Sequence, residues 1–432
     1  MSRQRFEIEG GQPIAGRIRP SGNKNAALPL LAAALLTSQD VVLRNVPAIR
    51  DVEVMLEILA DLGVAVSRRG PGVVALRAAA VDVKDPEVRM ARRIRASILL
   101  VGPLLARRGH VRTPPPGGDV IGRRRIDTHV LALRALGATF EPGAEVYDFR
   151  AHSRLRGAEI FLDEASVTGT ENAVMAAALA DGRTTIMNAA CEPHVQDLCR
   201  LINAMGGRIT GIGTNALAID GVERLGGADY TLGPDYTEVG SLIVLAAVTG
   251  GDLVIEDARP AEHRATRLAL GRLGIGWEVT ADGRDVHVPA GQALRVAAEI
   301  AGAVPKIEDA PWPGFPADLT SIAVVAATQA DGMVLVHEKL FESRLFFVDR
   351  LIAMGARLIL CDPHRVVVSG PSRLRGQDLV SPDIRAGMAL VIAALCAEGR
   401  SVIHNVQQID RGYERIDERL AALGAKITRA DD

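Results

Sequence analysis

The sequence is poor in aromatic residues and in lysine, and each shortage narrows the possibilities. Aromatic side chains make up only 3% of the 432 residues, so the core must consist of alanine, valine, leucine and isoleucine. Only five of the 50 basic residues are lysines, which makes each lysine worth attention. The formal net charge of −2 argues against a nucleic-acid or membrane surface built on bulk charge.

Cysteines and long apolar runs are also scarce. The four cysteines (Cys191, Cys199, Cys361 and Cys396) show neither a CxxC motif nor metal-ligand spacing, which favours a reducing compartment. The first residues, MSRQRFEIEGG, do not resemble a signal peptide, and apolar runs such as 26–36 are too short to cross a bilayer. We therefore expect a cytoplasmic protein that does not enter a membrane.

Three widespread catalytic signatures are missing from the sequence. It contains no GxxxxGK[ST], no GxGxxG behind a strand and no HExxH. These absences exclude a P-loop nucleotidase, a dinucleotide-binding fold and a zinc hydrolase of the common types.

What the chain does contain is a unit that occurs six times. In each unit a helix ends in Leu/Met-Gly-small and a strand follows; the glycines are Gly63, Gly137, Gly206, Gly274, Gly355 and Gly424. Successive glycines are 68 to 81 residues apart. A glycine at this point predicts a left-handed cap at the carboxyl end of the helix.

Each unit also contains a helix that is apolar nearly all round, followed by a polar or glycine turn and a short strand. The first example is NKNAALPLLAAALLTSQDVVLRNVP. Such a helix is normally buried, whereas DVEVMLEILADLG has one polar face. A solenoid is the alternative, but a period near 70 is long for one and buried helices require a closed core. We therefore predict a closed α/β fold in two groups of three units.

Charged residues occur at the starts of the six apolar helices. In chain order they are Lys24, Arg95, Glu171, Glu238, Asp318 and Arg385. A helix start carries a partial positive charge and binds anions, so a basic residue there is locally unfavourable. The three basic members therefore suggest a ligand with several negative charges.

Single arginines follow three of the strands at similar offsets. They are Arg344 in FESR, Arg411 in IDRGYER and Arg124 after the loop PPPGGD. If the repeats close around a cleft, these guanidinium groups converge, and their planar forks match phosphate and carboxylate oxygens. A single arginine in such a position is more often a surface residue than a ligand-binding one.

The motifs SGNKNAALPLLAAALL, RASI, PPPGGDVIGRRRID, PGFPADL, FESR, DIRAG and IDRGYERI resemble those of the UDP-N-acetylglucosamine 1-carboxyvinyltransferases. These enolpyruvyl transferases catalyse the first committed step of peptidoglycan synthesis. The likeness extends along the whole chain, from GGQPIAG to LGAKI. A relationship to 5-enolpyruvylshikimate-3-phosphate synthase is implied for the fold alone.

The resemblance implies two inside-out α/β barrels of three βαβαββ repeats each, with a cleft between them. The first domain would comprise residues 24–233 and carry a catalytic loop at 113–127. Residues 1–23 would join 234–432 in the second domain. The substrates would be phosphoenolpyruvate and UDP-N-acetylglucosamine, with no metal, other cofactor, nucleic acid, membrane or obligate protein partner.

The resemblance also implies a role for each matching residue. Asp119 would deliver a proton to the methylene carbon, and Asp318 would take the proton of the sugar 3-hydroxyl. Phosphoenolpyruvate would be bound by Lys24, Arg124, Arg344, Arg385 and Arg411, with Asp383 near the reacting carbon. The nucleotide sugar would contact Asn25, Arg95 and Asp127.

The loop acid departs from the common pattern of the family, in which a cysteine occupies the position of Asp119. The surrounding arginines favour an ionised carboxylate, so a dianionic substrate or burial would have to keep the proton on it. Fosfomycin alkylates the cysteine of the family, and a carboxylate is a poorer nucleophile. We therefore expect insensitivity to this drug. A plain loop carboxylate paired with Arg124 is the alternative interpretation.

Other departures lie at Glu164 and at 236–241, 319–321 and 343–345. They leave open a related enolpyruvyl transferase that acts on a different nucleotide or nucleotide sugar. A non-catalytic protein that binds UDP-N-acetylglucosamine is a further alternative, although a sensor has no need of both an acid and a base. We expect His129 to be structural or to support the site indirectly, and Cys191 to serve packing.

Overall fold

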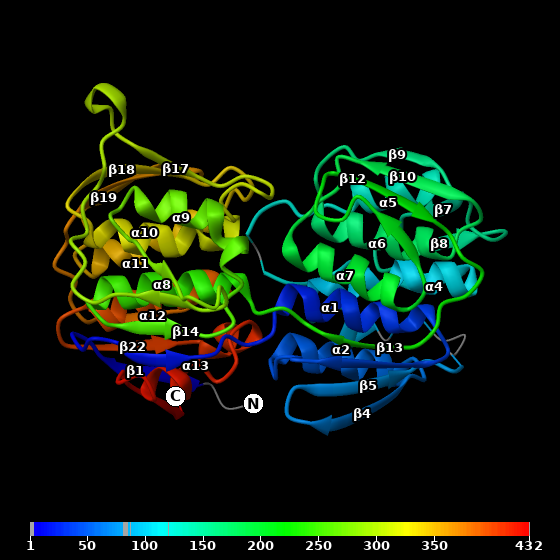
Figure 1. Ribbon diagram of the computed structural model, residues 1–432, viewed down its shortest axis with the longest axis horizontal. Helices are drawn as coiled ribbons and strands as arrows, with labels where there is room; N and C mark the ends of the chain where they lie inside the picture. Colours follow the sequence, from blue (N-terminus) through cyan, green and yellow to red (C-terminus); the bar gives the residue numbers. More distant parts are fainter. Residues whose placement is uncertain (1–3, 81–84, 87, 120, 432) are drawn as a thin grey trace. The chain divides into compact units, whose positions relative to one another are not determined.

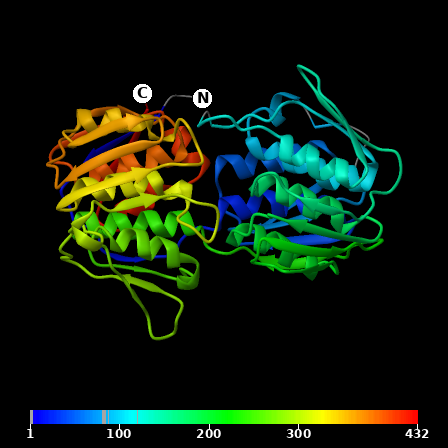
Figure 2. The same cartoon turned by 90° about the horizontal axis from the view of Figure 1, so that it is seen from above.

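The computed structural model describes residues 4–80, 85–86, 88–119 and 121–431. The chain forms two compact units. The C-terminal unit comprises residues 4–21, 121–123 and 234–431, and the N-terminal unit comprises the other described residues from 22 to 233. In each unit the helices lie inside and the sheets outside (Figures 1 and 2).

The N-terminal unit contains three repeats. The first is α1 (Lys24–Ala33), η1 (Ala34–Leu36), β3 (Asp40–Arg44), α2 (Arg50–Asp61), β4 (Ala65–Gly70) and β5 (Val73–Arg77), joined by the distant β13 (Ala228–Thr231). The second is α3 (Val88–Ala91), η2 (Arg95–Leu100), α4 (Val101–Arg108), β6 (His110–Thr113), α5 (Asp127–Ala135), β7 (Ala138–Glu141) and β8 (Tyr147–Ala151). The third is β9 (Glu159–Phe161), α6 (Val167–Ala178), β10 (Arg183–Met187), α7 (Pro193–Ala204), β11 (Arg208–Thr210) and β12 (Ala216–Asp220).

The C-terminal unit contains the other three repeats. The fourth is β2 (Gly16–Ile18), α8 (Tyr236–Thr249), β14 (Leu253–Ile255), η3 (Pro260–His263), α9 (Arg264–Gly271), β15 (Glu278–Val279) and β16 (Val286–Val288). After η4 (Ile300–Gly302), the fifth is β17 (Lys306–Glu308), η5 (Ala317–Leu319), α10 (Thr320–Gln329), β18 (Gly332–His337), η6 (Arg344–Phe347), α11 (Val348–Ala353), β19 (Leu358–Asp362) and β20 (Arg365–Gly370). The sixth is β21 (Asp378–Val380), α12 (Ile384–Cys396), β22 (Arg400–His404), η7 (Val406–Arg411), α13 (Ile416–Ala421), β23 (Lys426–Asp431) and, from the other end of the chain, β1 (Gln4–Glu9).

The repeats share one pattern of strand pairing. In the order β17-β18-β20-β19 the first pair is parallel and the other two are antiparallel. The order β9-β10-β12-β11 has the same directions, and so does β2-β14-β16-β15. Five of the six described sheets have this pattern, and the sheet β6-β8-β7 has only its two antiparallel pairings, so one folding unit is used repeatedly, as the sequence predicted.

Burial follows the apolar pattern. Helices α1, α6, α8, α10 and α12 are buried on nearly every side, because Ala, Val, Leu and Ile occupy at least half of the positions of each and are spread around the helix. By contrast, α2 and α7 bury one face and leave the other half-buried or exposed. Four buried helices begin at a side-chain cap, provided by Asn23, Ser166, Asp235 and Asp383.

All six predicted glycines have a positive φ, between 79° and 99°. This confirms the predicted left-handed residue at the end of each amphipathic helix. One prediction about the helix starts is wrong. Glu171 does not open the third apolar helix, because Ser166 caps it and α6 begins at Val167, which places Glu171 one turn inside.

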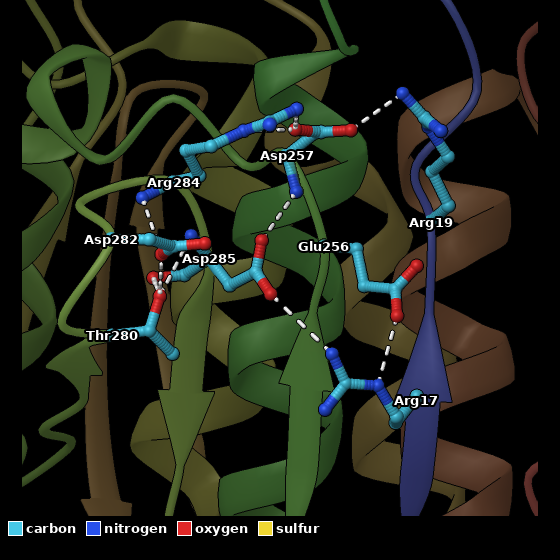
Figure 3. Close-up of polar contacts among 8 residues, drawn as sticks. All are labelled: Arg17, Arg19, Glu256, Asp257, Thr280, Asp282, Arg284 and Asp285. Carbon is cyan, nitrogen blue, oxygen red and sulfur yellow. Dashed lines mark hydrogen bonds and ion pairs between the residues drawn. The ribbon is translucent and has the colours of Figure 1, made fainter.

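The N-terminal segment is joined to the C-terminal unit by surface ion pairs as well as by strands. Figure 3 shows Arg17, on β2, with its Nε 2.8 Å from Oε1 of Glu256. Arg19 lies 2.5 Å from Asp257, and Arg284 also contacts Asp257. Both acids follow β14 directly, so these pairs hold the parallel β2–β14 edge, although exposed pairs contribute only about 0–1 kcal/mol each.

Candidate active site

The densest buried charge in the C-terminal unit surrounds Asp318, which lies on η5 just before α10. Its Oδ1 accepts a hydrogen bond from Nη2 of Arg344 at 3.0 Å. Its Oδ2 lies 3.1 Å from Nε and 3.0 Å from Nη2 of Arg385. Both arginine side chains are almost fully buried, whereas the Asp318 side chain is 25% exposed. One carboxylate therefore faces two guanidinium groups, and solvent reaches it from only one side.

Aromatic rings cover the two arginines. The Arg344 guanidinium lies 4.8 Å from the ring centroid of Phe341, and that of Arg385 lies 5.5 Å from the ring of Tyr413. Burial opposes the charge of Arg385, but Asp318, Tyr413 and Asp235 together hold the pKa of Arg385 well above its ordinary value. Arg385 is therefore a permanently charged anchor for an anion.

Two further predicted residues belong to this unit. Asp383 caps α12, and its Oδ1 accepts the backbone N–H groups of Arg385 at 2.8 Å and Ala386 at 3.0 Å. It thereby fixes the backbone from which the Arg385 side chain extends. Arg411 ends η7 and donates from Nη1 to Oε1 of Gln408 at 2.9 Å.

In the N-terminal unit, Lys24 opens α1 and is buried together with Asp51. Their Nζ and Oδ2 atoms are 2.7 Å apart, and both side chains are less than 10% exposed. Asn25 is half-buried, and its backbone N–H donates to the Oδ1 of Asn23 at 2.8 Å. The start of α1 therefore carries a fixed lysine next to a satisfied cap.

Arg95 and Arg124 form a second basic group in this unit. Burial, with a smaller contribution from the charge of Arg124, lowers the pKa of Arg95 to about 10. Arg95 also donates to the carbonyl of Arg125 at 3.1 Å. Two guanidinium groups that repel one another in this way suit a ligand with at least two negative charges.

The loop that carries Asp119 passes directly over Arg95. A side chain at Gly118, where φ is +106°, would lie 2.8 Å from Cβ of Arg95, and one at Gly117 would lie 1.8 Å from the carbonyl of Arg92. Both glycines are therefore required by close approach. Asp119 itself is half-buried. Residues 121–123 of the predicted loop pack in the C-terminal unit, where the N–H of Ser343 donates to Ile121.

Asp127 begins α5 at the edge of a cavity of about 660 Å³. The lining includes Asp127, Val130, Leu131, Arg134, Phe140 and Tyr147. Asp127 is exposed, and its Oδ2 lies 2.9 Å from Nε of Arg125. Aromatic walls with a carboxylate at the edge suit a planar heterocycle that has N–H donors.

His129 lies in the core, as its predicted structural role requires. Its Nε2 is 3.0 Å from Oγ1 of Thr168, and its Nδ1 is 2.8 Å from Nδ2 of Asn172. Burial, helped by the charge of Arg95, lowers the pKa of His129 to about 3, so the ring is neutral. Cys191 is buried as well.

Sequence reasoning missed three residues that contact the site, namely Asp51, Glu338 and Tyr413. Tyr413 lies inside the IDRGYERI motif and could have been chosen for that reason. Asp51 and Glu338 carry no such signal, because only the tertiary structure brings them to Lys24 and Arg344. Among the described residues, no group of three or more His, Cys, Asp or Glu side chains is arranged to hold a metal ion.

The chain belongs to the EPSP synthase family. The model of this family, described as EPSP synthase (3-phosphoshikimate 1-carboxyvinyltransferase), matches residues 8–420. The enolpyruvyl transferase NikO from Streptomyces tendae is 25% identical, with a TM-score of 0.86 over 100% of both chains. An EPSP synthase from Acinetobacter baumannii, at 18% identity and a TM-score of 0.76 over 100% of both chains, shares the fold.

Sequence relatives define the group within this family. Proteins from Treponema denticola and Bradyrhizobium diazoefficiens are each 56% identical, over 98% and 99% of this chain and 98% of their own. A protein from Treponema pallidum is 57% identical over 98% of both chains. All three are named UDP-N-acetylglucosamine 1-carboxyvinyltransferase, and the chain belongs to this family of transferases. The predicted resemblance and fold class are thus confirmed.

Proposed function

We propose that this enzyme transfers the enolpyruvyl group of phosphoenolpyruvate to the 3-hydroxyl of UDP-N-acetylglucosamine and releases phosphate. The observation that carries the proposal is the identity of 56–57% over at least 98% of the chain to three proteins named for this reaction. The reaction begins peptidoglycan synthesis in the cytoplasm. None of the four cysteines forms a disulfide in the structure, which suits such a reducing compartment.

Arg344 and Arg385 are suited to bind the phosphate and carboxylate of phosphoenolpyruvate. Both are buried, both are charged, and both already hold one carboxylate, that of Asp318, at 3.0 Å. A buried guanidinium fork binds such planar or tetrahedral anions through paired hydrogen bonds. Lys24, Arg124 and Arg411 supply further positive charge, as the family resemblance implies.

Asp318 would act as the general base for the sugar hydroxyl. A carboxylate bonded to two guanidinium groups is a weak base, because both stabilise its negative charge. An anionic substrate on the same arginines would compete for these hydrogen bonds and make Asp318 more basic. Substrate binding would therefore activate the base at the moment it is needed.

The chemistry would proceed by addition and elimination. In the addition, Asp119 gives its proton to the methylene carbon of phosphoenolpyruvate, the sugar oxygen bonds to the adjacent carbon, and Asp318 takes the hydroxyl proton. In the elimination, the Asp119 carboxylate left by the addition takes a proton from the new methyl group, the carbon–carbon double bond forms again, and the carbon–oxygen bond to phosphate breaks. Arg344 and Arg385 would stabilise the charge on the departing phosphate.

The nucleotide would occupy the N-terminal unit. Arg95, with the charge of Arg124 acting on it, would bind the diphosphate, and Asn25 would contact the sugar. The cavity at Asp127 is large enough for a pyrimidine ring, with Phe140 and Tyr147 as its aromatic walls. Asp127 would accept the N–H of a uracil.

The test is phosphate release from phosphoenolpyruvate, measured with and without UDP-N-acetylglucosamine. Release should require the nucleotide sugar, and it should fall by about 10²–10⁴-fold in Asp119→Asn and in Asp318→Asn because each loses a proton-transfer group. Asp362→Asn, a substitution in an exposed ion pair with Arg365, is the matched control and should keep full activity.

The outcomes separate the alternatives. Phosphate release with another nucleotide, but none with UDP-N-acetylglucosamine, would identify a different acceptor. Tight binding of the nucleotide sugar without any release would identify a non-catalytic binding protein. Full activity in Asp119→Asn would keep the transferase and remove the acid from Asp119.

A further inference from the structure

A second carboxyl group lies behind the anion-binding arginines, and the chemistry described above does not use it. Glu338 follows β18 and is fully buried. Its Oε2 lies 3.6 Å from Nε of Arg344, whereas Asp318 contacts Nη2 of the same guanidinium. We propose that Glu338 is a positioning residue, which lies against the Nε edge of Arg344, fixes Phe341 over its guanidinium and controls how much of the positive charge of Arg344 reaches the substrate anion.

The contacts of Glu338 fix its place. Its Oε1 accepts the backbone N–H of Phe341 at 3.2 Å, and Phe341 is the residue whose ring lies on the Arg344 guanidinium. Its backbone carbonyl faces Nδ1 of His364 at 2.7 Å. Glu338 therefore links the end of β18, the β19–β20 turn and the start of η6, from which Arg344 extends.

The distance to Arg344 is too long for a hydrogen bond. Oε2 of Glu338 and Nε of Arg344 are both buried, and they do not hydrogen-bond one another. A fully ionised pair in such a place would be expected to close to hydrogen-bonding distance. The geometry suits a carboxyl group that orients the arginine without neutralising it.

The surrounding charges explain how Glu338 does this. Burial raises the pKa of Glu338 to about 8; Arg344 lowers it, and the Asp309 carboxylate raises it. Asp309 is itself fully buried, and its carboxylate accepts the backbone N–H groups of Lys339 and Leu340. The other polar side chain that faces Glu338 is Thr320, at the start of α10.

Protonation of Glu338 then decides the charge of the cluster. At neutral pH Glu338 is a neutral acid, so the negative charges beside Arg344 and Arg385 are those of the Asp309 and Asp318 carboxylates. Above pH 8 Glu338 ionises and adds a further negative charge next to Arg344. The affinity for an anion should fall as this happens, because a like charge then lies behind the guanidinium.

The experiment compares the pH dependence of kcat/KM for phosphoenolpyruvate in the wild type, Glu338→Gln and Glu308→Gln. Glu308 is half-exposed on β17 of the same repeat and contacts Lys306 and Lys339, so its substitution makes the same charge change outside the site. In the wild type and in Glu308→Gln, kcat/KM should fall by up to about tenfold per pH unit above pH 8. Glu338→Gln should lose this fall, with the change in KM and not in kcat. A Glu338→Gln profile that superimposes on the wild type would overturn the proposal.

Two further measurements keep the test decisive. Glu338→Asp keeps the acid but withdraws it by one methylene, so it should keep the alkaline fall in kcat/KM and raise KM; an unchanged KM would count against positioning.

The proposal rests on the proposed function for its substrate, and inorganic phosphate serves as an independent probe. Even if no enolpyruvyl transfer occurred, the wild type should bind phosphate more weakly at pH 9 than at pH 7, and Glu338→Gln should not. Equal pH dependence in both would overturn the role of Glu338 alone.

Discussion

Asp119 illustrates at the scale of one residue how chemistry can be changed without changing the fold. The glycines before it are fixed by close contacts with Arg92 and Arg95, so the loop can vary only beyond them. A carboxyl group can deliver a proton as a thiol can, but it is a much weaker nucleophile. The proposed role of Asp119 as an acid therefore does not require that it react with fosfomycin.

We predict that fosfomycin at low concentration neither inhibits the enzyme nor forms an adduct on Asp119, because the carboxylate is a poor nucleophile. D119C should gain sensitivity while keeping activity. Mass spectrometry of the loop peptide and phosphate release after incubation would measure both. A covalent adduct on the wild-type Asp119 would contradict the prediction, and the exposed Cys361 provides an internal control for unspecific alkylation.

His129 makes a prediction about acid stability. Its pKa is about 3 in the folded protein and near 6.5 in an unfolded chain, so between these values only the unfolded chain takes up the proton. The free energy of unfolding should therefore fall as the pH drops below 6.5, by about 1.4 kcal/mol per pH unit for this residue. Urea unfolding at pH 7.5, 6 and 5 would measure the slope.

His129→Gln should reduce this slope without removing it, because burial lowers the pKa of His263 to about 4 as well. Substitution of His110, whose side chain is partly exposed and paired with Asp148, is a suitable control. If the slope of His129→Gln equalled that of the wild type, the buried histidine would not be responsible for acid lability.

At the scale of the elements, the six amphipathic helices end in the same way. Each stops at a glycine with positive φ, and a strand of the outer sheet begins one to four residues after that glycine. A residue other than glycine adopts this conformation at a cost of about 1–2 kcal/mol. The repeat is therefore visible in the sequence because the backbone leaves almost no alternative at these six positions.

We predict that Gly137→Ala lowers the free energy of unfolding by about 1–2 kcal/mol, from backbone conformation alone. A Cβ at Gly137 would contact nothing within 4 Å, so steric clash does not contribute. Gly271→Ala is the matched control, since it also has open space but lies in α9 without a positive φ. There alanine should be neutral or stabilising by about 0.5–1 kcal/mol. Equal effects in chemical denaturation would contradict the argument.

Strand β1, from the start of the chain, completes a sheet that is otherwise formed by the end of the chain. It lies between β22 and β23 and is antiparallel to both, so the first described residues of the chain complete the sheet formed by its last ones. Phe6 and Ile8 point into the core of the C-terminal unit and are fully buried. This unit cannot complete its sixth repeat until both ends of the chain are present.

We predict that Phe6→Ala destabilises the protein by about 3–5 kcal/mol, because it leaves a cavity in the core. Phe161→Ala removes the same ring from a position on β9 that is 69% exposed and should have little effect. Thermal and urea unfolding would compare the two variants. A similar loss in both would show that β1 is not an integral part of the core.

The whole chain contains no helix, within its described residues, that is both long and apolar enough to span a membrane. The core of each unit includes apolar helices that are buried beneath the sheets of the same unit. The side chains proposed for the reaction come from loops and helix starts, not from the sheet interiors.

Much of the fold, and several residues of the candidate site, could be predicted from the sequence alone. Helix periodicity, the recurring glycine and the apolar helices determined the six α/β repeats, because each follows from local backbone and burial preferences. The family motifs identified the transferase and indicated Asp318, Arg344 and Arg385 as site residues. The error at Glu171 arose because a cap depends on the geometry of one side chain, and a buried charge inside an apolar helix looks like its start.

Which charged side chains contact one another was determined only by the tertiary structure. Residues as far apart in the chain as Asp318 and Arg385 share hydrogen bonds because the fifth and sixth repeats pack their apolar helices together. Glu338 acquires its raised pKa from burial, which no local pattern encodes. The sequence determined which residues could carry charge and where each helix would end. The tertiary structure determined the electrostatic environment of those charges, because that depends on distances and solvent exclusion between segments far apart in the chain.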